Sequence, residues 1–174
     1  MPYGACYNCS IETQRQEGKM ATRARIAIEN ADGSILSSYH HWDGYPAGLG
    51  FNLISHWDDP ETLLEAIRLG DASNWGKRIA PKGEHSFNAP EDGVNVYYGR
   101  DRGEENVGPV DFADFADFEA NWNMAGEEYA YCLRRDGTWT MIDRYGERVT
   151  HDAEDDIVIA RADMIKFYRN RKAA

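Results

Sequence analysis

The sequence lacks several features that would assign it quickly to a functional class. No apolar run approaches the ~18–20 residues of a membrane span, and the N-terminus lacks the charged-then-apolar pattern of a signal peptide. Basic residues are few, with 19 Lys and Arg against 30 Asp and Glu and a net charge of −11. We therefore expect a soluble intracellular protein without a membrane segment. Direct nucleic-acid binding is disfavoured because phosphate contacts need Lys and Arg, whereas a basic protein partner or mimicry of nucleic acid stays open.

Cysteine is also scarce. The chain has three, Cys6, Cys9 and Cys132, and an odd number without a signal peptide favours reduced thiols. Cys6 and Cys9 form a lone C-x-x-C, whereas a structural zinc site needs four ligands. They are weak candidates for a metal or redox site, and we predict no cofactor.

The chain is long enough for one domain with a real core. It has 174 residues, of which 42% are hydrophobic and 12% aromatic. Residues 1–19 are polar and lack periodicity, and Met20 resembles a second start directly before the first strand. We predict that 1–19 form a flexible extension and that 20–174 form a single domain.

Alternating apolar residues predict two β-hairpins. Strands over 22–30 and 35–42 flank Asp32-Gly33, a dipeptide suited to positive φ. Strands over 129–134 and 138–143 flank Asp136-Gly137 in the same way. One more strand is expected over 94–98.

Helical spacing of apolar residues predicts the remaining elements. The expected helices cover 48–57, 60–69, 111–122 and 152–171, with a loop over 71–92. Asp59 before Pro60 is a typical helix start, and Gly70 a typical stop. The predicted fold class is α+β, a single domain with an antiparallel sheet of hairpins and helices packed on one face.

The segment from His40 to Gly50 concentrates chemistry on a turned loop. Three side chains are candidates for catalysis or metal binding: His41, Asp43 and His85. His40 and His41 are adjacent on a strand, so at most one of them faces a given site. The sequence has no H-E-x-x-H and no nucleophile elbow. Alternatively, one histidine packs in the core and Asp43 caps the turn that Gly44 makes.

Arginines and aromatics suggest a ligand site. Arg100 and Arg102 could clamp a phosphate or carboxylate, or pair internally with Asp101 and Glu104. Strand aromatics such as Tyr97 could stack a base, or belong to the core. The predicted ligand-binding residues are His40, Trp42, Tyr45, Tyr98, Arg100, Arg102 and Glu104.

The expected helix over 111–122 carries a short Asp-Phe repeat. Its phenylalanines share one face, and Asp111, Asp114 and Asp117 are available to a protein partner. The alternative is a core-packing helix whose carboxylates are solvated.

Several motifs together resemble a known family. The chain carries, in order, Trp42-Asp43-Gly44-Tyr45-Pro46, Gly48, Gly50, Leu69-Gly70-Asp71, His85-Ser86-Phe87 and Tyr98-Gly99-Arg100-Asp101-Arg102-Gly103-Glu104. Over roughly residues 20–105 this set is similar to a family of small uncharacterised proteins of tailed phages, cyanophages included. The resemblance implies a phage accessory protein acting in the host cytoplasm, without implying a mechanism.

Three functional hypotheses follow. The first is a non-enzymatic phage accessory protein that binds a host protein or a small anionic ligand in host takeover or counter-defence. The second is a metal- or His/Asp-dependent hydrolase of nucleotide-like substrates, which would use His41, Asp43, His85 and Arg100. The third is a virion structural component.

Overall fold

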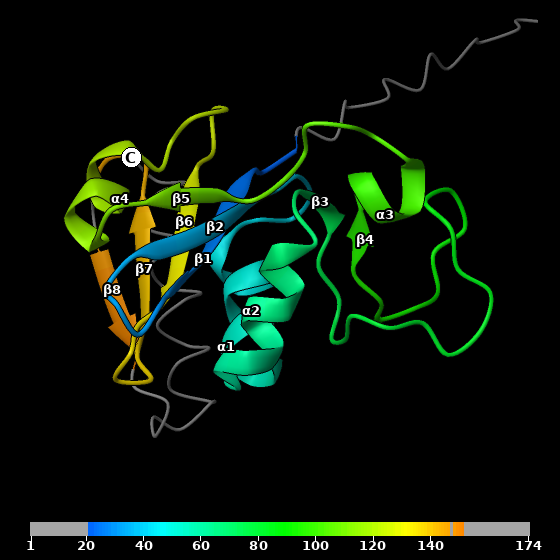
Figure 1. Cartoon of the computed structure of the whole chain (residues 1–174), viewed down its shortest axis with the longest axis horizontal. Coiled ribbons are helices and arrows are strands. Elements are labelled where there is room, and N and C mark those ends of the chain that lie inside the picture. Colours follow the sequence, from blue (N-terminus) through cyan, green and yellow to red (C-terminus); the bar gives the residue numbers. More distant parts are fainter. Residues whose placement is uncertain (1–20, 147, 152–174) are drawn as a thin grey trace, which may run out of the picture.

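Strands and helices interleave along the chain in the computed structural model, which describes residues 21–146 and 148–151 (Figure 1). The strands are β1 (Ala24–Glu29), β2 (Ile35–His40), β3 (Ala72–Asn74), β4 (Val96–Tyr97), β5 (Val110–Phe112), β6 (Tyr129–Leu133), β7 (Trp139–Asp143) and β8 (Arg148–His151). The helices are a π-helical turn η1 (Pro46–Gly50), α1 (Phe51–His56), α2 (Pro60–Arg68), α3 (Tyr98–Arg102) and α4 (Phe115–Asn121).

These elements form an α+β fold, as predicted, around one sheet. Its strand order is β4-β3-β2-β1-β6-β7-β8, and β5 pairs with the start of β2 beside β3. The sheet is mixed, whereas the sequence led us to expect an antiparallel one. β1–β2 and β6–β7 are antiparallel hairpins, but β1–β6 and β2–β3 pair in parallel. Hairpin patterns fix direction only within a hairpin, and long connections are free to deliver a strand either way.

Helices lie on both faces of the sheet rather than on one. Ala24, Ile26 and Ile28 of β1 point into the core that α1 and α2 cover. Ala27 points the other way, into a second core with Phe118 of α4. Side chains alternate along a strand, so each face needs its own cover. Figure 1 shows α1 and α2 beneath β1 and β2, with β3, β4 and α3 displaced to the right.

The turn and cap predictions are confirmed. Gly33 and Gly137 adopt φ of 93° and 85° in the two hairpin turns. The Asp59 carboxylate accepts a hydrogen bond from the Thr62 backbone N–H at the start of α2. Gly70 follows the end of that helix with φ of 88°, a left-handed conformation that favours glycine.

Two segments differ from the prediction. The expected loop 71–92 begins with β3, and the expected helix 111–122 is split into β5 and α4. The helix starts late because Asp114 caps it: its side chain accepts from the Asp117 N–H. The extension 1–19, with Cys6 and Cys9, and the helix predicted over 152–171 lie outside the described residues.

Cys132 is buried in β6, and burial raises the pKa of its thiol.

Gly70 gives the first testable prediction. A Cβ at this position would meet the Val107 carbonyl oxygen, and the positive φ adds strain. We expect Gly70→Ala to lower the free energy of unfolding by about 3 kcal/mol or more. Gly103 is the matched control, because its φ is 74° but no atom lies within 4 Å of the added Cβ. Gly103→Ala should cost only about 1 kcal/mol in urea denaturation, and equal losses would refute the packing role of Gly70.

Candidate functional site

The Trp-Asp-Gly-Tyr-Pro loop is held by backbone contacts. Gly44 donates its N–H to the Thr22 carbonyl (2.8 Å), and the Tyr131 hydroxyl donates to the Gly44 carbonyl (2.7 Å). A Cβ on Gly44 would lie 2.7 Å from the Ala24 Cβ, so only glycine fits there. Asp43, rather than Gly44, takes the positive φ, at 57°. This loop is therefore a close-packed corner of the fold.

Two backbone hydrogen bonds place the loop beside β3. His41 N–H donates to the Ala72 carbonyl and Trp42 N–H to the Ser73 carbonyl, both at 3.1 Å. This short parallel pairing brings the residues after β2 alongside those after β3. Segments that are more than 30 residues apart in the chain thereby share one surface.

A cavity of about 240 Å³ lies where these segments meet. We call it the loop cavity. It is lined by His40, Trp42, Asp43, Gly48, Leu49, Asn52, Asn74, Trp75, Gly76, Lys77, Asp92 and Gly93. Of the predicted site residues, His40, Trp42 and Asp43 are in this lining.

Two buried rings of the lining carry unpaired nitrogens. His40 is 1% exposed and Trp75 is 5% exposed. His40 Nδ1 and Trp75 Nε1 have no hydrogen-bond partner within the described part of the chain. Burial lowers the pKa of His40 to about 4. A hydrogen bond with the Trp42 backbone acts in the opposite direction and has a smaller effect on this pKa. At neutral pH the ring is uncharged.

Another part of the cavity wall, the segment after β3, is held by hydrogen bonds from side chains to its backbone. Asn52 Nδ2 donates to the carbonyls of Trp75 (3.0 Å) and Gly76 (2.8 Å), and Trp57 Nε1 donates to the Gly76 carbonyl (3.0 Å). A Cβ on Gly76 would meet the Gly93 backbone. The segment after β3 is therefore fixed in place, and the cavity is preformed.

His41 lies on the opposite side of the strand from His40. Its Nδ1 is 2.6 Å from the Tyr39 hydroxyl, and its ring packs edge-on against Trp42 with centroids 4.7 Å apart. Burial raises the pKa of Tyr39 to about 12 and, together with nearby Arg23, lowers that of His41. His41 and Tyr39 are thus a neutral, hydrogen-bonded pair outside the cavity lining.

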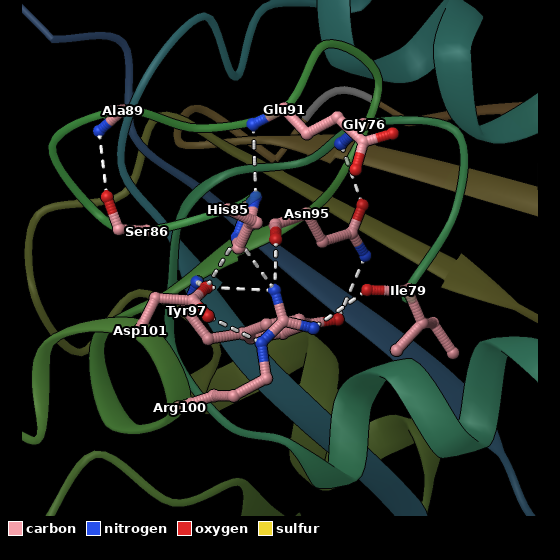
Figure 2. A network of polar contacts seen from close by, with 10 residues as sticks. All are labelled: Gly76, Ile79, His85, Ser86, Ala89, Glu91, Asn95, Tyr97, Arg100 and Asp101. Atoms are coloured by element: carbon pink, nitrogen blue, oxygen red, sulfur yellow. Dashed lines mark hydrogen bonds and ion pairs between the residues drawn. The ribbon is translucent and has the colours of Figure 1, made fainter. Parts of the chain in front are cut away.

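His85 belongs to a third location, a polar network in the loop between β3 and β4 (Figure 2). The Glu91 N–H donates to His85 Nδ1 (3.1 Å), and Nε2 lies 3.3 Å from Asp101 Oδ2 and 3.2 Å from a terminal nitrogen of Arg100. Both ring nitrogens are occupied, whereas a general base needs one free to reach substrate. The structure places His85 with Arg100, and His41 and Asp43 elsewhere.

Arg100 uses its donors inside the protein. It donates to the carbonyls of Ile79 (2.7 Å) and Asn95 (2.6 Å) and to the Asp101 carboxylate (2.6 Å). Its guanidinium lies over the Tyr97 ring. Burial raises the pKa of Asp101, but hydrogen bonds from Arg100 and the Tyr97 N–H outweigh this and lower it. Arg100 therefore links the loop between β3 and β4 to α3. Its guanidinium is not free to bind a phosphate or carboxylate ligand.

The other predicted ligand residues serve similar contacts. Arg102 pairs with Glu104 at 3.1 Å and lies over the Phe87 ring. Tyr98 packs on the same Phe87 with centroids 5.5 Å apart, and Tyr45 packs against the hydrophobic core. The internal pairing considered for these arginines is what the structure contains.

The carboxylates proposed for a protein partner have local roles. Asp114 and Asp117 both accept backbone hydrogen bonds at the start of α4, Asp114 from the Asp117 N–H (2.8 Å) and Asp117 from the Ala113 N–H (3.0 Å). Asp111 is exposed on β5.

Sequence reasoning missed the residues that complete the loop cavity. Asn52 lies inside a predicted helix, and Trp75 and Lys77 in a segment read as loop, so periodicity gave no reason to join them to His40. It also missed a buried ion pair on the opposite face, Arg25 with Glu127 at 2.6 Å. A charged residue at an inward position of an alternating strand is the signal that could have found this pair.

Comparison with known proteins adds no assignment. No family model, curated protein or solved structure matches the chain. Among residues 21–146 and 148–151, no group of His, Cys, Asp and Glu is arranged to hold a metal ion. No helix in the same residues is long and apolar enough to cross a membrane. The phage resemblance therefore stays a prediction.

The Arg100 network predicts a strong side-chain preference. Lysine has one nitrogen and cannot reach two carbonyls and a carboxylate together. We expect Arg100→Lys to lower the free energy of unfolding by about 1–2 kcal/mol. Arg102→Lys, at an exposed pair, should change it by less than about 0.5 kcal/mol. Urea denaturation of both variants measures the difference. An unchanged free energy of unfolding in Arg100→Lys would contradict the structural role of Arg100.

His40 predicts a pH dependence of stability. Its folded-state pKa is depressed from 6.5 to about 4, so the unfolded chain binds more protons between these values. Stability should therefore fall as pH drops from about 6.5 to 4, by about 3 kcal/mol from this group. His40→Gln should lose that component when unfolding free energies are compared at pH 7 and pH 4.5. An equal fall in unfolding free energy between pH 7 and pH 4.5 for the two proteins would contradict the prediction.

Proposed function

We propose that this protein is a non-enzymatic accessory protein of a tailed phage, which binds a small polar ligand in the host cytoplasm during host takeover or counter-defence. The observation that carries the binding role is the loop cavity, which gathers polar side chains from separate segments of the chain. Asp43, Asn74, Lys77 and Asp92 of its lining are exposed, so a polar ligand in the cavity can reach them.

The side chains proposed for catalysis favour a non-enzymatic role. His85 has both nitrogens occupied, Arg100 is engaged by backbone carbonyls, and His41 is bonded to Tyr39. A hydrolase that used these residues would need them in one pocket, but their contacts lie in separate places. The phage setting is supported by the motifs between residues 20 and 105.

The cavity also favours a small ligand over a host protein as the primary partner. The carboxylates considered for protein docking, Asp114 and Asp117, cap α4. The small anionic ligand expected from Arg100 and Arg102 is less favoured, because neither arginine is among the described lining residues.

Ligand binding can be tested by thermal denaturation against a library of small polar compounds. A compound present at about 100 times its Kd should raise Tm by about 5–10 °C. Asn74→Trp places a large ring in the cavity lining at an exposed position and should abolish the shift. The matched control is Asn88→Trp, an exposed asparagine outside the described lining, which should keep it. If no library compound shifts Tm, the binding role is refuted.

The accessory role predicts where the protein occurs during infection. Mass spectrometry should find it in the soluble fraction of infected cells and not in purified phage particles. Stoichiometric amounts in the particles would instead support the virion structural alternative.

A further inference from the structure

We infer that the loop cavity binds a basic amino acid, a small molecule that carries two cationic groups and one carboxylate. This inference rests on the ligand binding proposed above and names the class of ligand. The exposed side chains of the lining would recognise the ligand, and none of the buried atoms in the cavity wall is needed for it.

Three ionic side chains of the lining remain available to a ligand. Asp43, Lys77 and Asp92 are exposed, and among the described residues none of them forms a side-chain hydrogen bond or an ion pair. The Lys77 ammonium is therefore more than 4.0 Å from either carboxylate. The neighbouring Arg78 and Glu91, by contrast, pair with each other. Unpaired charges of both signs thus surround one cavity.

A ligand that complements these charges carries two cations and one anion. The two carboxylates attract cationic groups, and the ammonium of Lys77 attracts a carboxylate. An amino acid with a cationic side chain has this set of charges. Its net charge is positive, which favours its approach to a protein of net charge −11. His40 is uncharged at neutral pH because of its burial, so it does not repel the cationic groups.

Two further side chains of the lining favour arginine among the basic amino acids. Trp42 is 37% exposed, and a guanidinium stacks on aromatic rings and is more weakly hydrated than an ammonium. Asn74 is exposed as well, and its amide can both donate and accept hydrogen bonds. The volume of about 240 Å³ is below the ~300–1,000 Å³ of drug-sized sites, which suits a ligand as small as an amino acid.

The test compares arginine with citrulline and agmatine by isothermal titration calorimetry at neutral pH. Citrulline has a neutral urea group in place of the guanidinium, and agmatine lacks the carboxylate. We expect arginine to bind at least about tenfold more tightly than either compound. Citrulline that binds as tightly as arginine would overturn the role of the two carboxylates. Agmatine that binds as tightly would overturn the role of Lys77.

Carboxylate variants test whether the cavity is the site. Asp43→Asn and Asp92→Asn should each weaken arginine binding about tenfold, and asparagine tolerates the positive φ at position 43. The matched control is Asp58→Asn, which removes an exposed carboxylate outside the lining and should change binding by less than about twofold. Equal effects of all three would indicate general attraction to an acidic surface and would contradict the assignment.

Lys77→Gln tests the contact with the ligand carboxylate, and Lys82→Gln is its matched control. Lys82 is also exposed, but it is outside the lining. Lys77→Gln should reduce the preference for arginine over agmatine to about twofold or less, whereas Lys82→Gln should keep it. Because both lysines are exposed, both variants should fold, and urea denaturation checks this. An unchanged preference in Lys77→Gln would refute the contact.

The amino-acid assignment and the broader binding function can fail separately. If arginine does not bind but another compound of the library raises Tm and is excluded by Asn74→Trp, the cavity binds a ligand and the amino-acid assignment is wrong. If no compound binds, the ligand-binding function itself is wrong.

Discussion

The candidate site depends on a parallel pairing of only a few residues. Where β2 ends, the N–H groups of His41 and Trp42 bond to the carbonyls of Ala72 and Ser73. These two bonds hold the corner that begins at Trp42 against the segment that follows β3, and the cavity lies between them. Gly44 contributes from the other side, since its close approach to Ala24 keeps the corner against β1.

Local signals predicted the parts of the fold that local physics controls. The Asp-Gly turns, the Asp59 cap and the Gly70 stop are all present, because each is decided by a few neighbouring residues. The parallel pairing of β1 with β6 was not predictable in the same way, since it joins residues about a hundred positions apart. The position of α4 on the second face follows from this pairing, because Ala130 and Cys132 of β6 help to form the surface on which it packs.

For the candidate site, the sequence drew attention to the loop that lines the cavity, but it grouped this loop with residues that the structure places elsewhere. His40, Trp42 and Asp43 line the cavity, whereas His85 and Arg100 stabilise a neighbouring loop. Histidine, arginine and carboxylate side chains suggest catalysis when only the sequence is considered. The same side chains also form hydrogen bonds with backbone carbonyls and N–H groups, which a long irregular segment needs. Asn52 and Trp75 have no such signature, and only the folded chain places them beside His40.

The parallel pairing of β1 with β6 also sets the order in which the protein can be completed during synthesis. The β1–β2 hairpin is synthesised before β6, so one edge of β1 stays open until residues 129–133 follow. At about 5–20 residues per second, this is an interval of several seconds in which a central strand has an unpaired backbone edge. A truncation before β6 would leave this central strand with an open backbone edge, a template for pairing with another chain.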